Sequence, residues 1–274
     1  MRVLVIGKAK TGTTVMASLI QDALHTAQLV MEPKSVIAFH ASSMVSNDQV
    51  IKIIFEHFDN RYRHLNAIVH AEFGFPIDKV VFIMRDFRDE MISRLLYFSK
   101  TLRGPAATPA AWARWMERLK QKEESPSAIS FWDLCEDFLR IFGVDVWTNI
   151  TSTCLRYSAQ YEGFVKNSVT RDKFLIQYEE IIEGKMQGLS AYLGMPIGRA
   201  EDVDLRKFAY TKRSSSHGAW RSFLTEDDVV RLKPTIAAAL KDKAYEDWDL
   251  TPVAWLNPAY YSQYVERMTS DKVD

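Results

Sequence analysis

Residues 2–20 read RVLVIGKAKTGTTVMASLI, and this stretch decides the fold. The run Arg2–Ile6 is apolar and rich in β-branched residues without polar alternation, which predicts a strand buried on both faces. Gly7 ends this strand and a loop follows, after which apolar residues recur at helical spacing between Val15 and His25. Strand, glycine loop and helix in this order predict an anion-binding loop, because a helix N-terminus offers free N–H groups and the positive end of its dipole.

The composition limits the classes of protein to consider. The 274 residues suit one large α/β domain, and 47% of them are hydrophobic, which is enough for a sizeable core. Lys+Arg and Asp+Glu both number 35, so the zero net charge argues against non-specific binding to nucleic acid. No apolar run approaches the ~18 residues of a membrane helix, and the first residues form a strand, not a signal peptide. We therefore expect a cytoplasmic protein without membrane association.

Two cysteines, Cys135 and Cys154, lie in apolar segments of helical pattern. We expect two buried thiols in preference to a disulfide or a metal site. The sequence contains no C-x-x-C or H-E-x-x-H pattern, so we expect no bound metal.

The rest of the chain alternates between strand-like and helix-like segments. We expect further strands at 27–31, 66–70, 79–84 and 173–177, and helices at 50–58, 89–99, 108–122, 130–142, 146–167, 179–193 and from residue 225 on. This alternation predicts an α/β three-layer sandwich with a mainly parallel central sheet, in a single domain covering residues 1–274. A helical insertion is expected at about 103–167. Functional loops should lie at the carboxyl ends of the strands.

The first loop departs by one residue from the nucleotide-hydrolase phosphate loop G-x-x-x-x-G-K-[ST]. Thr13 stands where that pattern has lysine, and Lys10 supplies a cation three positions earlier. The hydroxyls of Thr11, Thr13 and Thr14 surround this lysine with neutral donors. One lysine among many neutral donors favours a 5′-phosphate group over a magnesium triphosphate.

The stretch Lys10-Thr11-Gly12-Thr13-Thr14 resembles the 5′-phosphosulfate loop of the sulfotransferases that use 3′-phosphoadenosine 5′-phosphosulfate (PAPS). Residues 81–93, VFIMRDFRDEMIS, are similar to the 3′-phosphate signature of that family. Arg85 and Ser93 occupy the two positions that grip the 3′-phosphate there, and the chemistry agrees, because an arginine and a hydroxyl can hold one phosphate together. Phe87 departs from the usual proline.

Two later stretches resemble the same family. Tyr178 follows a strand in FLIQYEE, as does the tyrosine that approaches the adenine in the family. Residues 212–221, KRSSSHGAWR, resemble a late R-K-G…G-x-W-[KR] segment, with Arg213 seven residues before the tryptophan. Ser214 and Ser215 replace Lys-Gly in that segment. Val15 replaces the tryptophan that stacks on adenine in cytosolic members.

The resemblance implies transfer of a sulfuryl group from PAPS to a hydroxyl or amine, in line and without a metal, leaving 3′-phosphoadenosine 5′-phosphate (PAP). Lys10 would offset charge on the leaving oxygen, and Ser93 would hold Lys10 until the acceptor binds. The acceptor would be a small molecule or a carbohydrate, with the helical insertion forming its side of the site. The sequence does not indicate the oligomeric state.

Two residues compete for the role of the base that accepts the acceptor's proton. Glu32, in LVMEP, resembles the presumed glutamate base of carbohydrate and several bacterial sulfotransferases. His70 ends the expected strand at 66–70 and resembles the histidine of the lysine-threonine-histidine stretch in cytosolic members; a histidine titrates near neutral pH. A carboxylate acts as a base near neutral pH when burial disfavours its charge. His40, Glu72 and His217 remain further alternatives.

Two other functions stay open at this stage. A kinase with a variant phosphate loop would transfer phosphoryl groups with Mg²⁺, but Thr13 removes the lysine that such an enzyme needs. A nucleotide-binding protein of the same fold without turnover is compatible with the departures at Val15, Phe87, Ser214 and Ser215.

Overall fold

The computed structural model describes residues 1–25, 27–102, 105–168, 172–201, 216–240 and 245–269. The chain divides into two compact units, which we describe separately. Unit 1 comprises Met1–Arg85 and Tyr157–Thr211, and unit 2 comprises Asp86–Arg156 and Lys212–Asp274. The helices predicted as an insertion at about 103–167 fall in both units.

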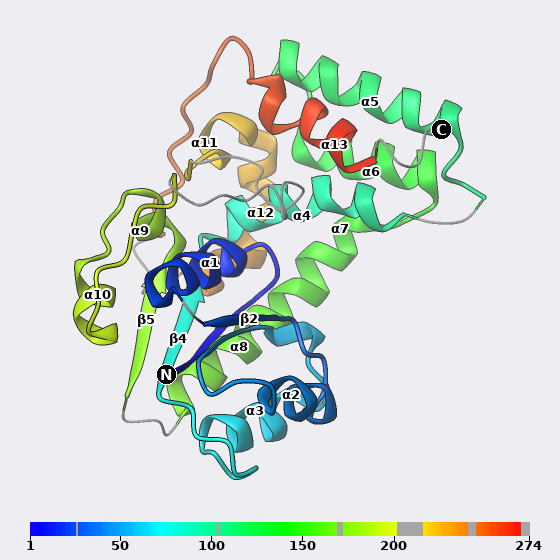
Figure 1. The fold of residues 1–274 in the computed structure, drawn as a ribbon. Helices are drawn as coiled ribbons and strands as arrows, with labels where there is room; N and C mark the ends of the chain where they lie inside the picture. The colour runs from blue at the N-terminus through cyan, green and yellow to red at the C-terminus, as the bar shows by residue number, and fades with distance from the viewer. Residues whose placement is uncertain (26, 103–104, 169–171, 202–215, 241–244, 270–274) are drawn as a thin grey trace. The chain divides into compact units, whose positions relative to one another are not determined.

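Unit 1 is built on a five-stranded sheet in which all strands are parallel (Figure 1). Its strands are β1 (Arg2–Gly7), β2 (Gln28–Met31), β3 (Gln49–Ile54), β4 (Lys79–Met84) and β5 (Lys173–Gln177), in the spatial order β2-β3-β1-β4-β5. The central strand, β1, is buried along its whole length. The predicted α/β class with a parallel sheet is confirmed.

Helices cover both faces of this sheet. One face packs against α1 (Thr13–Leu24), α9 (Tyr178–Ile182) and α10 (Gln187–Leu193) through a core that includes Val5, Ile20 and Leu189. The other face packs against α2 (Val36–Ser43), α3 (Arg61–Val69) and α8 (Leu155–Asn167) through a core that includes Phe39 and Phe164. A short 3₁₀ turn, η1 (Phe55–His57), joins β3 to α3. Because successive strand residues face opposite sides, the two cores use alternate residues of the strands.

Three local predictions in unit 1 are wrong. Residues 50–58 form β3 and η1, not a helix, because apolar spacing fitted both and burial on both faces within the sheet decided for the strand. Residues 66–70 end helix α3, not a strand, since Leu65, Ile68 and Val69 bury one helical face. The single helix expected at 179–193 is two helices, and Gly184 lies between them at φ 71°.

Unit 2 is helical in its described parts. Its elements are α4 (Phe87–Thr101), α5 (Pro109–Glu124), α6 (Phe131–Phe142), α7 (Val146–Thr148), the π-helical turn η2 (Asn149–Cys154), α11 (Trp220–Phe223), α12 (Glu226–Leu240), η4 (Pro258–Tyr260) and α13 (Ser262–Thr269). A capping box of Ser130 and Asp133 begins α6, and Gly143 ends it in the left-handed conformation. Cys135 and Cys154 are buried free thiols, as predicted.

Buried charges join distant stretches of unit 2. The Asp89 carboxylate accepts hydrogen bonds from the backbone N–H groups of Gly218, at 2.6 Å, and Trp220, at 3.0 Å. The Arg88 guanidinium lies 3.6 Å from the Trp220 ring centroid and pairs with Asp86 at 2.7 Å. Arg88 and Asp89, from one stretch that resembled a sulfotransferase signature, therefore contact Gly218 and Trp220 from another.

Candidate functional site

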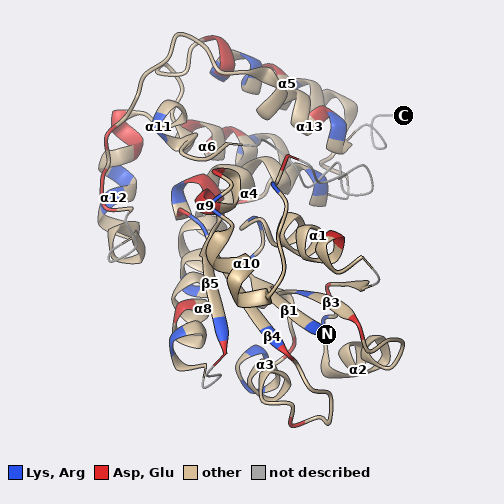
Figure 2. Ribbon diagram, turned by 60° about the vertical axis from the view of Figure 1, so that its left-hand side comes forward, with Lys and Arg blue, Asp and Glu red and all other residues tan. Residues whose placement is uncertain are grey.

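The glycine loop leaves the N-terminus of α1 open. Gly12 is the N-cap residue at φ 88°, no side chain caps the helix, and its first turn carries no acid. A helix terminus without a capping acceptor presents its N–H groups to an external anion. Figure 2 shows that α1 carries no Lys or Arg, so any positively charged side chain at this terminus comes from outside the helix.

The structure brings Arg85 and Tyr178 onto this loop. Nη1 of Arg85 donates to the backbone carbonyl of Lys10 at 2.8 Å, and the guanidinium lies 4.3 Å from the centre of the Tyr178 ring. The ring also lies against Gly12, where an added Cβ would stand 2.4 Å from Cδ2 of Tyr178. Lys10 adopts φ 70°, a left-handed conformation that is costly for a residue with a side chain. Four predicted site residues, Lys10, Gly12, Arg85 and Tyr178, are thus assembled around one turn.

A buried lysine that the sequence interpretation missed links Glu32 to the loop. Nζ of Lys52, on β3, pairs with Oε1 of Glu32 at 2.6 Å and donates to Oγ1 of Thr14 at 2.7 Å. The Lys52 side chain is 4% exposed and that of Glu32 is 37% exposed. Burial lowers the pKa of Lys52 below its ordinary value, and the Glu32 carboxylate opposes that shift. Glu32 is therefore a paired, partly exposed carboxylate, not the isolated buried acid that the sequence argument required of a glutamate base.

The signal for Lys52 was present in the sequence. Four β-branched residues, Val50, Ile51, Ile53 and Ile54, surround one lysine in that run. A lysine inside a strand buried on both faces needs a partner, and this requirement marks it as a site candidate. The helical interpretation of 50–58 concealed it.

A second set of contacts surrounds the loop on the face of α3 and α8. Nζ of Lys8, in the loop, donates to Oγ of Ser158 on α8 at 2.5 Å, and Lys8 is 5% exposed. The backbone N–H of Ala9 donates to Oε1 of Glu56 at 3.0 Å. These bonds hold the first half of the loop against η1 and α8.

A buried tyrosine fixes the spacing of the two strands that lead to the site. The hydroxyl of Tyr161 donates to the carbonyl of Ile6 at 2.8 Å and accepts from the N–H of Ile83 at 3.1 Å. Burial raises the pKa of Tyr161, so the hydroxyl stays a proton donor at any physiological pH. The ends of β1 and β4 are tied together just before the loop and Arg85.

His70 does not lie at a strand end. It is the exposed C-cap residue of α3, a helix that runs back from the carboxyl end of β3 toward the start of β4. The strand prediction behind its assignment as the base is wrong. His40, another alternative, packs its ring against Phe73 and Phe75, with centroids 5.5 Å and 4.8 Å away.

Thr11 and Thr13 are buried residues of unit 1, and the hydroxyl of Thr11 donates to the carbonyl of Lys8 at 2.8 Å. The remaining predicted site residues belong to unit 2 or to parts not described. Ser93 is a buried residue of α4 in unit 2. Arg213, Ser214 and Ser215 lie outside the described residues.

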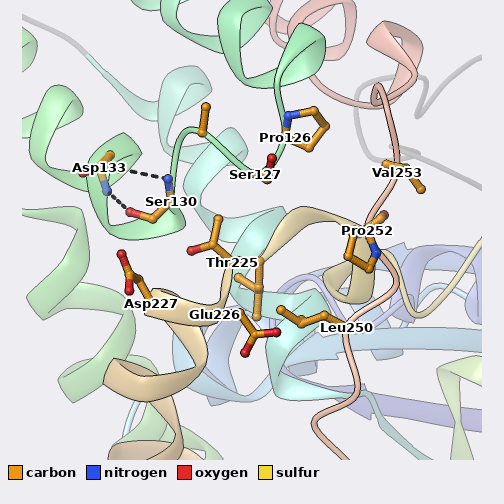
Figure 3. Close-up of a pocket in the computed structure, with 13 residues that line it drawn as sticks. Pro126, Ser127, Ser130, Asp133, Thr225, Glu226, Asp227, Leu250, Pro252 and Val253 are labelled. Atoms are coloured by element: carbon orange, nitrogen blue, oxygen red, sulfur yellow. Dashed lines mark hydrogen bonds between the residues drawn. The ribbon is translucent and has the colours of Figure 1, made fainter.

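Unit 2 has a pocket of its own, of about 300 Å³. Figure 3 shows it between the turn that carries Pro126 and Ser127, the start of α12 and the segment around Pro252. Ser130 and Asp133 satisfy each other in the capping box drawn there. Its lining offers proline, small polar groups and acids, without Lys or Arg, and does not suit a phosphate.

The described residues offer neither a cluster of metal ligands nor a helix that could span a membrane. No cluster of three or more His, Cys, Asp and Glu is placed there to hold a metal ion. In the same part of the chain, every helix is too short or too polar to span a membrane.

Comparison with known proteins finds distant likeness among solved structures. No protein-family model and no curated protein matches the chain. Among solved structures, it matches mouse sulfotransferase SULT7A1 complexed with PAP at a TM-score of 0.48 and 12% sequence identity, covering 90% of this chain and 89% of that chain. The assignment of the α/β class is independent of this match, since the parallel sheet defines it.

Proposed function

We propose that this protein transfers a sulfuryl group from PAPS to a hydroxyl or amine acceptor and releases PAP. The observation that carries the proposal is the open N-terminus of α1, with the loop of Lys10 before it and with Arg85 and Tyr178 packed on it. Such a loop suits the 5′-phosphosulfate, because backbone N–H groups and one lysine meet an anion without a metal. An arginine and an aromatic ring beside it suit the 3′-phosphate and the adenine.

The proposed chemistry assigns separate roles to the charged groups. Lys10 offsets the negative charge that develops on the oxygen bridging phosphorus and sulfur as the S–O bond breaks. We assign the role of proton acceptor to Glu32 by its position, because Lys52 ties its carboxylate to Thr14 at the start of α1. Glu32 would accept the proton that the acceptor loses as its oxygen or nitrogen bonds to sulfur, although it lacks the burial that the sequence argument required. Lys52 positions Glu32 and Thr14 relative to each other. His70 has no role in this scheme.

Calorimetry tests the proposal against both alternatives. We expect PAP to bind at micromolar concentration without Mg²⁺, and Arg85→Ala to weaken that binding at least tenfold, since a hydrogen bond to a charged group contributes about 1.5–3 kcal/mol. Arg140→Ala is the control, because this side chain is 67% exposed and pairs only with neighbours on α6. Thermal melts of both variants separate lost binding from lost folding.

Each alternative has its own outcome. Preference for ATP with Mg²⁺ over PAP would contradict the sulfotransferase assignment and favour a kinase. Binding of PAP and PAPS without sulfate transfer to a broad panel of alcohols, phenols, amines and sugars would favour the non-catalytic protein. Replacement of Glu32 by glutamine should then leave PAP binding intact and abolish turnover.

A further inference from the structure

Arg61, the first residue of α3, presents a guanidinium group for which the described residues supply no acceptor. Its central carbon lies 4.8 Å from the ring centroid of Tyr157 and 5.9 Å from that of Phe55. Its Nε is buried and has no hydrogen-bond partner, and the guanidinium makes no hydrogen bond or ion pair with the described residues. A buried donor without a partner costs stability, and an oxyanion arriving from solvent would satisfy it.

The position of Arg61 at the N-terminus of α3 also disfavours the stability of this helix. Arg61 and Arg63 both lie in the first turn of α3, which carries no acid and has no side-chain cap. Cations at this end oppose the helix dipole. An external anion would relieve this cost.

Two hydrogen bonds connect the turn before Arg61 to the proposed reaction site, one to the Glu56 side chain and one between backbone groups. The turn before it bonds to the loop, because Glu56 accepts from the N–H of Ala9 at 3.0 Å. It also bonds to the segment that follows Glu32, because the N–H of Asp59 donates to the carbonyl of Lys34 at 2.8 Å. Tyr157, which supports the guanidinium, precedes the residue that binds Lys8. The turn that leads into Arg61 thus contacts both the donor loop and the segment that follows the proposed base.

We infer that Arg61 is an acceptor-binding residue and that the acceptor carries an oxyanion, either a carboxylate or a sulfate ester, which the guanidinium binds through two N–H groups. An arginine held against aromatic rings is preorganised for this fork-shaped contact. The inference rests on the proposed function only in naming the ligand an acceptor. The anion site itself stands on the geometry of Arg61.

Three ligands that differ in one group test the inference. The probes are 4-nitrophenyl β-D-glucoside, its 6-sulfate and 4-nitrophenyl β-D-glucuronide, each titrated calorimetrically into the protein with and without saturating PAP. We expect at least one charged ligand to bind tenfold or more tightly than the neutral glucoside. If the glucuronide binds more tightly, the site prefers a carboxylate. If the 6-sulfate binds more tightly, the site prefers a sulfate ester.

Variants assign the effect to one side chain. Arg61→Ala should abolish the preference for the charged ligand, and Arg61→Lys should restore it only in part, because a lysine lacks the two-pronged geometry. Arg63→Ala is the matched control, an exposed arginine in the same helical turn, and should keep the preference. If Arg61→Ala unfolds, Arg61→Gln takes its place.

The outcomes separate this inference from the proposed function. Equal affinity for the three ligands, including no measurable binding of any of them, contradicts the anion site, and so does a preference that survives Arg61→Ala. Failure of the wild-type protein to bind PAP contradicts the proposed function, while the titrations without PAP still judge Arg61.

Discussion

Replacing Gly12 by alanine tests whether the turn around Tyr178 is built as the structure shows. Two costs arise at this position. The first is the left-handed backbone at φ 88°, which costs about 1–2 kcal/mol for a residue with a Cβ. The second is overlap with the Tyr178 ring at 2.4 Å, which forces the ring to move and costs about 1–3 kcal/mol, as overpacking generally does.

Gly194→Ala is the matched control in the same unit. Gly194 has φ 72°, close to that of Gly12, but an added Cβ would meet nothing within 4 Å. The two variants share the backbone cost, so the loss in unfolding free energy should be greater for Gly12→Ala by about 1–3 kcal/mol, the overpacking term alone. Urea unfolding followed by circular dichroism measures this difference.

Displacement of Tyr178 should also weaken nucleotide binding. Because the ring supports the Arg85 guanidinium, we expect Gly12→Ala to weaken PAP binding at least tenfold, or about 1.4 kcal/mol. Gly194→Ala should bind PAP as the wild type does. Equal destabilisation by the two substitutions, or unchanged PAP affinity of Gly12→Ala, would refute the reasoning.

Three further predictions follow from single side chains. Lys52→Met should lower the rate of sulfate transfer about 100-fold or more, in the range seen for lost electrostatic donors, and a rate near that of the wild type would show that the Lys52–Glu32 pair is only structural. His70→Ala should leave turnover unchanged in a steady-state assay, since this side chain is exposed at the end of α3; a tenfold loss would restore it as a candidate base. Burial lowers the pKa of Lys122 to about 8, whereas the unfolded chain keeps the proton up to an ordinary value of 10.5. Stability should therefore rise from pH 8 to pH 10.5 relative to Lys122→Met in urea melts, and a constant difference would contradict the shift.

Local patterns were sufficient for the parts of the fold that depend on neighbours in sequence. The apolar run of β1, the glycines of the loop and the helical spacing of α1 are short-range features, and they predicted the strand and the helix that follows the loop. The same reasoning failed for residues 50–58 and 66–70, where short apolar runs fit either period. Burial on both faces, which is a tertiary property, made the first of these a strand.

The contacts that define the site depend on how strands from different parts of the chain align. The register pairs Val5 with Lys52, so this lysine points to the face of α1, where it meets Thr14 and Glu32. Spacing along the chain could suggest Glu32 as a base but could not supply its partner from a strand that begins 17 residues later, at Gln49.

The sequence by itself determined the class of fold, the place of the loop and the residue types available for an anion. The tertiary structure decided which residues meet. Arg85 and Tyr178 lie on the loop, and Lys52 pairs with Glu32. The turn before Arg61 contacts both the loop and the segment after Glu32. The tertiary structure also moved His70 to the far end of a helix. The physical reason is that parallel strands are joined by crossovers of variable length, so distance along the chain does not say which residues lie together. The residues at the carboxyl ends of the strands become neighbours only when the hydrogen-bond register and the alternation of side chains are both fixed.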